Sequence, residues 1–550
     1  MTEIPKEGAG RPLYESAPKI TPATPVLPAA PYLWAVAASY PLAWLYVKKL
    51  LVVNMFASLW LPVFAVLFLA GVEGMARALH RKAAGETPLW AGCWLALSCA
   101  MPVLGYQNTL SDWQLLAWHL LAVWFVLARC GMLAQGYTGS LFFLDALTGL
   151  IVLPFGGFFR RIGTLWEGLR VLGRQRLPLR RAGVALGTAL VTVLLCGTAW
   201  NLLSAADANF AAVGGRVQRW LADLLGYDAL MENTIVFLLS LPVGAWLYGL
   251  VAGALRRQTP PCPQERFFQG LEPLRLLPAL TANVAVGALC AVYGLFFALQ
   301  ALEWLAAAPL GLTAPQASAF AVDGFWELMR ILLLDFCVLA AVRFFGRQPL
   351  PRALAALFCL FGVGFAALAG AKLAVYIRLY AFTPRRVVAG WFLCVLALWA
   401  VLVLVRVFRV IPAVRIGLAA LAVSFVLLSC VDLESRIVRA NINRYGAGVD
   451  AELDLDVLRD CGLNPWYRYE SYQGDGSGKV VRYTGWLLDS GWFEGRSAAE
   501  IAELYDIPGE ALGSFGYEQQ ARLGESVLRL TFDKDYRCTQ AFLTAAQNGV

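Results

Sequence analysis

Charged side chains inside apolar segments are the residues of this sequence best placed to do chemistry. Asp323, Glu327, Arg330 and Asp335 lie in one apolar segment, and Lys372 lies in the next. Spacings of four and three residues predict that Asp323, Glu327 and Arg330 share one helix face, with Asp335 about one turn further on. An ionisable side chain at the middle of a bilayer costs at least ~2.5 kcal/mol, so these five residues are the first place to look for function.

The five residues form a candidate intramembrane polar cluster with two interpretations. They could line a polar pathway for an ion, a proton or a lipid headgroup. Alternatively, they could be salt bridges that hold helices together, with Glu327 pairing with Arg330 and Asp335 pairing with Lys372. Under both interpretations we expect Asp323, Glu327 and Arg330 to face the interior of a helix bundle.

Residues suited to metal-dependent or nucleophilic catalysis are scarce. The two histidines, His80 and His119, have no HExxH-like spacing, and the 12 cysteines form no CxxC motif. Most of these cysteines lie singly in apolar segments, where cysteine packs as a small hydrophobe. We therefore predict no metal, no cofactor and no catalytic residue. Cys461 and Cys538, outside those segments, could form one disulfide or stay as two thiols.

Apolar segments of about twenty residues must position these side chains. The chain is 59% hydrophobic and 15% charged, whereas a soluble domain has ~25% charged residues. A helix needs ~20 apolar residues to cross a bilayer, so we predict an all-α polytopic transmembrane bundle with about eleven crossings. The predicted crossings are residues 33–47, 50–72, 89–107, 113–133, 182–203, 233–255, 276–302, 323–342, 353–377, 387–405 and 416–432.

Three regions follow from this pattern. Residues 1–30 are rich in proline and are expected to be a disordered arm without a cleaved signal peptide. Residues 31–432 form the transmembrane domain, and residues 433–550 form a small soluble α+β domain. Within the transmembrane domain, Thr138–Phe159 is long enough to span but contains Asp145, Gly149, Pro154, Gly156 and Gly157. We predict that it is re-entrant or interfacial.

An arginine-rich segment, residues 160–181, indicates the orientation. It carries seven arginines against Glu167, and by the positive-inside rule it should be cytoplasmic. It reads as a helix on the inner membrane surface that contacts anionic headgroups, although the charge could also serve topology alone. The residues from Asp432 onward have a net charge of −7 and are then extracytoplasmic. The candidate headgroup contacts are Arg160, Arg161, Arg170, Arg174, Arg176, Arg180 and Arg181.

The polar tail shows a mixed pattern. Apolar spacing predicts short helices at Arg436–Tyr445 and Ala451–Arg459. Aromatic residues on either side of a glycine-rich turn predict a β-hairpin over residues 467–486. Ser497 and Glu500 are spaced as a capping box, which predicts a helix through Tyr505. Further helices are expected at Tyr517–Leu530 and Asp535–Ala546.

Five stretches occur in a distinctive order and spacing: Tyr293–Gln300, Phe320–Leu328, Lys372–Thr383, Arg385–Arg386 and Asn441–Tyr445. Together they resemble a bacterial family of multi-pass membrane proteins known as domain of unknown function forty-one fifty-three, with its relative forty-one seventy-three. The resemblance is good from about Ala182 to Tyr445, weaker before it, and fades after Asp456. It implies a topology and no activity.

The sequence therefore favours a non-enzymatic membrane protein of the cell envelope, a sensor or a scaffold, whose tail meets a protein partner. The alternative is a transporter or lipid-handling protein that uses the charged eighth and ninth crossings. We expect contact with anionic membrane lipids and no binding of nucleic acid, because an acidic tail is a poor ligand for phosphates.

Overall fold

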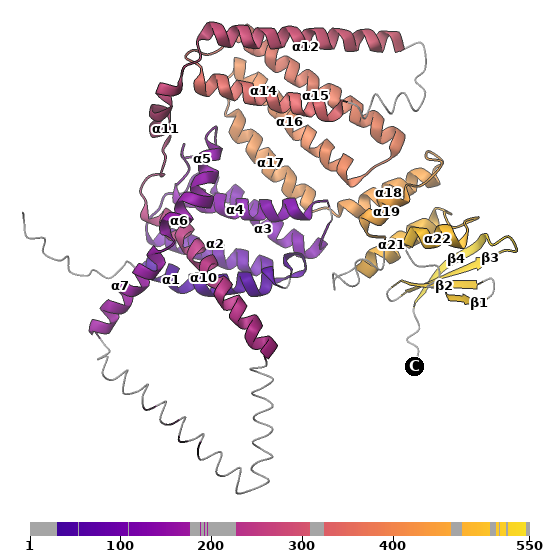
Figure 1. Ribbon diagram of the computed structural model, residues 1–550, viewed down its shortest axis with the longest axis horizontal. Coiled ribbons are helices and arrows are strands. Elements are labelled where there is room, and N and C mark those ends of the chain that lie inside the picture. The colour runs from indigo at the N-terminus through magenta and orange to yellow at the C-terminus, as the bar shows by residue number, and fades with distance from the viewer. Residues whose placement is uncertain are drawn as a thin grey trace, which may run out of the picture.

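The computed structural model shows a mostly helical chain with a small β-sheet near its C-terminus (Figure 1). It describes residues 30–52, 54–107, 109–175, 227–307, 324–463, 476–505, 513–515, 518–523 and 526–545, together with residues 188, 192, 195 and 198. The predicted disordered arm therefore lies outside the described residues, and so does most of the predicted crossing at 182–203.

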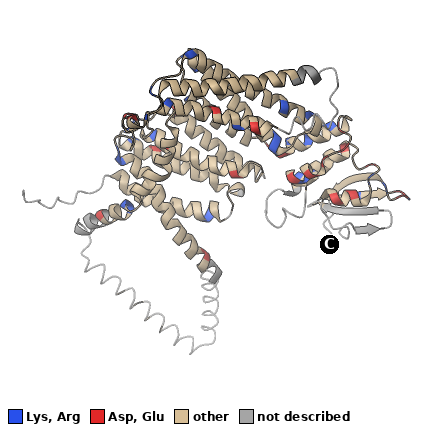
Figure 2. Ribbon diagram, turned by 45° about the horizontal axis from the view of Figure 1, so that its top comes forward, with Lys and Arg blue, Asp and Glu red and all other residues tan. Residues whose placement is uncertain are grey.

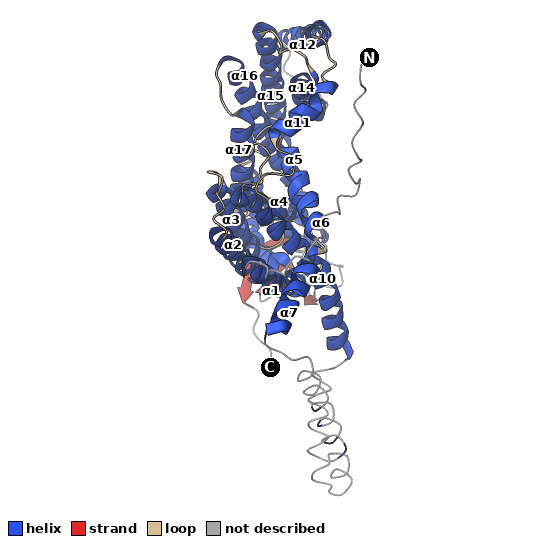
Figure 3. Cartoon of the chain, turned by 90° about the vertical axis from the view of Figure 1, so that its left-hand side faces the viewer, coloured by secondary structure: helices blue, strands red, loops and turns tan. Residues whose placement is uncertain are grey.

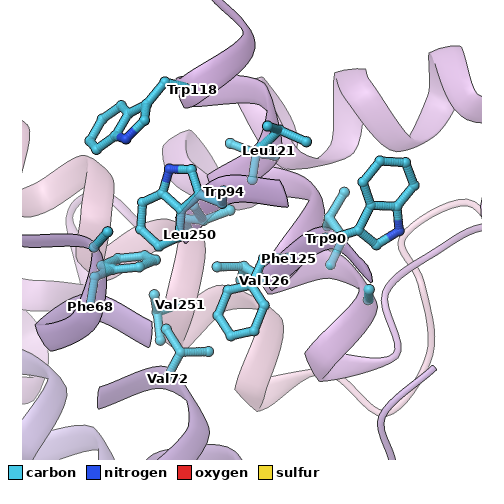
Figure 4. Close-up of a cluster of buried hydrophobic side chains, with 14 of the residues drawn as sticks. Phe68, Val72, Trp90, Trp94, Trp118, Leu121, Phe125, Val126, Leu250 and Val251 are labelled. Carbon is cyan, nitrogen blue, oxygen red and sulfur yellow. The ribbon is translucent and has the colours of Figure 1, made fainter. Parts of the chain in front are cut away.

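The first group of helices packs around a core rich in tryptophan. Trp94 and Trp118 are buried at its centre, with ring centroids 5.5 Å apart (Figure 4). Phe68 of the preceding helix packs edge-on against Trp94. The members of this group are α1 (Ala30–Leu45), η1 (Tyr46–Leu51), η2 (Met55–Ala57), α2 (Trp60–Ala78), α3 (Thr87–Leu104), α4 (Ser111–Cys130) and α10 (Tyr227–Arg256).

The stretch at Thr138–Phe159, predicted to be re-entrant or interfacial, forms short helical pieces. A 43° bend separates these pieces from the helix that follows. The pieces pack closely on α10: a Cβ at Gly249 would lie 2.1 Å from the carbonyl oxygen of Pro154, so only glycine fits there. The pieces are α5 (Phe142–Leu147), η3 (Thr148–Val152) and α6 (Leu153–Gly157), and the helix that follows is α7 (Arg160–Gln175).

A second group of helices follows the first along the length of the molecule (Figure 3). Its core contains Tyr293, Phe358 and Phe365. The last helix of this group packs on both α16 and α3 and so joins the two groups. The members are α11 (Gln264–Leu271), η4 (Glu272–Leu274), α12 (Ala279–Ala307), α14 (Phe325–Phe345), α15 (Arg352–Tyr380), α16 (Pro384–Phe408) and α17 (Ala413–Ser429).

Seven of the described helices are long and apolar enough to cross a membrane, or nine if two bent pairs each count as one span. The predicted number of about eleven is not confirmed. α1 ends after 16 residues and continues as a π-helix, and α14 carries four charged residues. Length and composition therefore place these two helices outside the seven.

The tail consists of short helices packed on a four-stranded antiparallel sheet of strand order β1-β2-β3-β4. The small α+β fold agrees with the prediction for this region. Its elements are α18 (Leu433–Gly446), α19 (Leu455–Leu458), η5 (Arg459–Leu463), α21 (Gly476–Asp489), α22 (Ala498–Tyr505), β1 (Gly513–Phe515), β2 (Glu518–Leu523), β3 (Ser526–Phe532) and β4 (Cys538–Ala545).

Two predictions about the tail are wrong. The second half of the predicted hairpin is α21, in which Val480, Tyr483 and Leu487 are buried at helical spacing. The residues expected to form its first strand, 467–472, lie outside the described residues. The last two predicted helices are strands, because Leu528, Leu530 and Phe532 are buried at alternate positions and match the two-residue period of a sheet.

The capping box is confirmed. The backbone N–H of Ser497 donates to Glu500 Oε2 at 2.7 Å, and the backbone N–H of Glu500 donates to Ser497 Oγ at 3.3 Å. The hydrogen bond from Ser497 holds the pKa of Glu500 below its usual value. The box therefore satisfies two backbone donors at the start of α22.

The tail is packed against the membrane part and is not a detached domain. Its hydrophobic cluster includes Leu110, next to α4, and Phe425 of α17. Asn441 of α18 accepts from the backbone N–H of Phe382 at 3.0 Å and donates to its carbonyl oxygen at 2.7 Å. The predicted boundary at 432/433 thus falls at a 67° bend between α17 and α18, within one continuous packed unit.

Candidate functional site

Asp335 is a carboxyl group enclosed between three helices of the second group. It lies midway along α14 and is 3% exposed. Tyr293 of α12 donates a hydrogen bond from its hydroxyl to Asp335 Oδ1 at 2.8 Å. A Cβ at Gly362 of α15 would lie 3.6 Å from Oδ2, so the absence of a side chain there leaves room for the carboxyl.

The second oxygen of Asp335 has no hydrogen-bond partner among the described residues. A buried polar atom without a partner is costly in an apolar interior. Such a carboxyl can be protonated, or can hold a proton or a small cation that passes through. Asp335 is therefore the predicted cluster residue with the clearest chemical capacity.

Lys372 does not pair with Asp335, and the prediction that it does is wrong. Lys372 is 8% exposed, and its Nζ lies near Gly324, where a Cβ would be 3.1 Å away. The neighbour of Asp335 on α15 is instead Gly362. Lys372 follows Gly362 by ten residues, about 15 Å along a helix. Because α14 and α15 run in opposite directions, Asp335 and Lys372 lie at different heights along the axes of these two helices.

Glu327 and Arg330 do pair, with Arg330 Nη1 3.5 Å from Glu327 Oε1. Both side chains are exposed, however, so the prediction that they face the interior is wrong. The inward face of α14 belongs to Phe325, Leu328 and Met329, which are buried in the second core. Asp323 lies outside the described residues. The five predicted residues therefore do not converge on one interior site.

Arg129 is a buried charge that the sequence reasoning missed. It is 5% exposed, at the end of α4. Its guanidinium donates to the carboxylate of Glu73 on α2 and, at 3.0 Å, to the carbonyl oxygen of Arg81. Glu73 also pairs with the exposed Arg77 four residues later. Only this last pair has a sequence signal, the i, i+4 spacing.

Glu86 connects the two helix groups. It is 6% exposed and accepts hydrogen bonds from Trp90 Nε1, from the backbone N–H and hydroxyl of Thr138, and from Arg415 Nε on α17. Thr138 and Arg415 lie 52 and 329 residues away in sequence, so no local pattern could have revealed this contact. Its saturated hydrogen bonding is typical of a structural role.

The turns that join α2 to α3, α14 to α15 and α16 to α17 form one surface together with the C-terminal ends of α4 and α10 and the segment around α11. We call this surface the loop face. It is held together by backbone hydrogen bonds such as Ala84 N–H to Ala128 O and Leu277 N–H to Phe345 O. Basic residues outnumber acidic ones on it, as the blue segments at the left of Figure 2 show. The described basic residues are Arg77, Arg81, Lys82, Arg129, Arg256, Arg257, Arg266, Arg275, Arg343, Arg347, Arg352, Arg406, Arg409 and Arg415, and the acidic ones are Glu73, Glu86, Asp145, Glu265 and Glu272.

The arginine-rich segment begins as α7. Arg160 is exposed and Arg161 is partly buried, and the exposed Leu165 and Trp166 follow on the same helix. An exposed apolar pair beside arginines is compatible with the interfacial helix predicted from the sequence. Of the other candidate headgroup contacts, the side chains of Arg170 and Arg174 and all of Arg176, Arg180 and Arg181 lie outside the described part.

Among the described residues, no three His, Cys, Asp or Glu side chains are grouped as metal ligands would be. Cys461 and Cys538 are both buried in the hydrophobic cluster of the tail as thiols, not as a disulfide. Burial raises the pKa of the Cys538 thiol, which keeps it protonated and unreactive. Of the two alternatives left open by the sequence, the structure therefore has the thiols.

Comparison with known proteins assigns the family. The model of the family described as "Domain of unknown function (DUF4153)" matches residues 92–464. The chain belongs to this family. No curated protein and no solved structure matches the chain.

The family region extends further toward the N-terminus than the resemblance seen in the sequence, and it ends one residue after η5. It includes Tyr293, Asp335 and Lys372, and it also includes Asn441 at the junction with the tail. It excludes Glu73 and the strands of the C-terminal sheet. The family part thus runs from α3 to η5, whereas α1 and α2 precede it and α21, α22 and the sheet follow it.

Proposed function

We propose that this protein is a non-enzymatic membrane protein of the cell envelope, a sensor or scaffold, in which the bundle and the tail act as one unit. The supporting observation is the junction around α18. Asn441 bonds to both backbone groups of Phe382, and Arg444 Nη2 donates to the carbonyl oxygen of Arg378 at 2.9 Å. A shift of the turn between α15 and α16 would therefore be passed to α18 and to the tail.

The arrangement of charges supports this proposal over transport. A pathway would need several polar side chains around a common interior, whereas Glu327 and Arg330 point outward and Asp335 and Lys372 lie at different levels. The runner-up, a transporter or lipid-handling protein, is favoured by one observation. The unpartnered Oδ2 of Asp335 is the kind of group that proton-coupled transport uses.

We further propose that the tail meets a protein partner and that the arginine-rich segment contacts anionic lipid headgroups. The support for the second contact is a helix with exposed Leu165 and Trp166 beside arginines. Each cation near an anionic leaflet contributes ~1 kcal/mol to binding.

The proposed location is the cell membrane, with the loop face cytoplasmic and the tail extracytoplasmic. The basic excess on the loop face supports this orientation. Basic residues on the opposite side weigh against it, but two of them have local roles. Lys48 Nζ bonds to Asn233 Oδ1 at 2.6 Å, and the Arg386 guanidinium lies 4.1 Å from the ring centre of Tyr376.

Reporter fusions should place Arg174 and Val550 in opposite compartments. We expect an alkaline phosphatase fusion to be active at Val550 and inactive at Arg174, with the reverse result for a green fluorescent protein fusion. A third fusion at Gln348, in the turn between α14 and α15, should behave like the one at Arg174. Cytoplasmic signals at both Arg174 and Val550 would contradict the orientation.

The role of the junction can be tested with Asn441→Ala. This change leaves the N–H and the carbonyl oxygen of Phe382 without their partner, at about 1–3 kcal/mol for each unsatisfied group. We expect the variant to insert in the membrane and to fail to reverse the phenotype of gene deletion. Asn443→Ala, on the exposed side of the same helix, is the matched control and should restore the wild-type phenotype.

The variant Asp335→Asn distinguishes the proposed sensor or scaffold function from transport. Asparagine still accepts a hydrogen bond from Tyr293 but cannot carry a proton on a carboxylate. If Asp335→Asn fails to complement while Asn441→Ala complements fully, transport becomes the better assignment.

A further inference from the structure

An apolar cavity of ≈ 240 Å³ lies within the first group of helices. Aromatic side chains form much of its wall, and three of them, Phe68, Trp94 and Trp118, are shown together in Figure 4. The lining residues are Tyr46, Phe64, Phe68, Trp94, Trp118 and His119, with Ala122, Val123, Val243, Trp246, Leu247 and Leu250 completing the wall.

The cavity opens sideways between α4 and α10. Its lining residues on α2 and α3 are buried, whereas Ala122 of α4 and Val243, Trp246 and Leu247 of α10 are partly exposed. These four residues lie near the middle of their helices, and both helices are candidate spans. At that depth the surrounding solvent is hydrocarbon, so whatever enters must come from the bilayer.

Trp94 gives the wall a fully buried hydrogen-bond donor without a partner among the described residues. Trp94 is 0% exposed, and its Nε1 has no hydrogen-bond acceptor among the described residues. The neighbouring Trp118 shows the contrast, because its Nε1 donates to Ser98 Oγ at 2.8 Å. A buried indole N–H usually finds a partner, so the N–H of Trp94 points to an acceptor oxygen supplied from outside the protein.

The imidazole ring of His119, another polar group of the wall, already has hydrogen-bond partners for both of its nitrogens. His119 Nδ1 lies 2.7 Å from the carbonyl oxygen of Leu115, which can only accept, so Nδ1 carries the hydrogen. The Nε2 of the neutral ring then accepts from the Tyr46 hydroxyl at 2.8 Å. This pair consumes its own donor, which leaves Trp94 as the fully buried donor offered to a ligand.

We propose that this cavity binds a bilayer-soluble molecule through a hydrocarbon portion that carries a carbonyl oxygen, with the oxygen accepting from Trp94 Nε1. An engineered cavity of about 150 Å³ lined by Leu, Ile and Phe takes up benzene. A cavity of ≈ 240 Å³ therefore accommodates a larger group than a single ring. Two sources share this chemistry: an acyl ester of a glycerolipid and a prenylated quinone. The site does not depend on the proposed sensor or scaffold role.

Photo-crosslinking in nanodiscs tests the proposal with the full-length protein. One arm uses phosphatidylethanolamine with a diazirine in its acyl chain, and the other uses an azido-ubiquinone analogue. After irradiation, we expect peptides containing Ala122–Val123 or Val243–Leu250 to be labelled in one arm, which then identifies the source. Excess unlabelled ligand should remove this labelling.

Two variants make the test specific. Ala122→Phe fills the cavity and should reduce labelling to the level seen without irradiation, whereas Ala96→Phe, at an exposed position on α3, should leave it unchanged. Trp94→Phe removes the N–H and keeps an aromatic ring, so it should weaken labelling without filling the cavity. Background labelling in both arms, or labelling that neither competition nor Ala122→Phe reduces, would overturn the proposal. If Ala122→Phe does not fold, competition in the wild-type protein decides.

Discussion

Glu434→Ala is expected to lower the free energy of unfolding by about 3–5 kcal/mol, because it removes the nearest carboxylate from the buried Lys479. Glu434 and Lys479 are 1% and 7% exposed, and Lys479 Nζ lies 3.4 Å from Glu434 Oε2. The next carboxylate, Asp432, is 3.9 Å from Lys479 Nζ and also pairs with Arg482. Thermal unfolding of the full-length protein in detergent, followed by circular dichroism, measures the loss.

The same network explains why the loss should be large. Ser435, next to Glu434, shares a hydrogen bond of 2.9 Å with the hydroxyl of Tyr483, which is fully buried on α21. Burial also raises the pKa of Tyr483, so its hydroxyl stays neutral and keeps this contact. Loss of Glu434 thus disturbs the contact between α18 and α21 that connects the tail to the bundle.

An exposed ion pair in the same domain provides the control for Glu434→Ala. Asp456 pairs with Arg459 but its side chain is 84% exposed, so Asp456→Ala should cost less than about 1 kcal/mol. A double variant, Glu434→Leu with Lys479→Met, removes both buried charges and should recover most of the lost stability. Equal destabilisation by Asp456→Ala and Glu434→Ala would show that the buried pair has no special role.

The membrane helices could be predicted because their signal is the length of an apolar run, which needs no knowledge of neighbours. α15 and α16 illustrate this, since each exceeds the predicted segment by only a few residues at either end. The side of a helix that faces the protein interior could not be predicted in the same way. The apolar residues of α14 are spread around the whole helix, so its sequence does not show that Phe325, Leu328 and Met329 face inward while Glu327 faces outward.

The strands of the tail could not be predicted for a different reason. Leu528, Leu530 and Phe532 alternate in burial, but the strands are short and their pairing is visible only once β2 and β4 are placed beside them. The capping box at Ser497 was predicted correctly because it is a local contact over three residues. The candidate site shows the same division: the Glu327–Arg330 pair follows from spacing, whereas the Asp335–Tyr293 contact joins residues 42 positions apart.

Glu73→Ala should destabilise the bundle by about 3–5 kcal/mol, whereas removal of the other arginine bound to Glu73 should not. Arg129 and Arg77 share the carboxylate of Glu73, but Arg129 is 5% exposed and the Arg77 side chain is 76% exposed. Among the described residues, Glu73→Ala leaves the buried guanidinium of Arg129 with only the carbonyl oxygen of Arg81 as an acceptor. Thermal unfolding in detergent gives the size of the effect.

Arg77→Ala is the matched control, because it removes an exposed partner of the same carboxylate and should cost less than about 1 kcal/mol. Glu73→Gln keeps an acceptor oxygen beside Arg129 but removes the charge, so it should fall between the two. If Arg77→Ala and Glu73→Ala destabilise equally, burial of Arg129 is not what makes the contact important. The expected difference follows from solvent: water replaces Glu73 more readily around Arg77, whose side chain is 76% exposed, than around Arg129, whose side chain is 6% exposed.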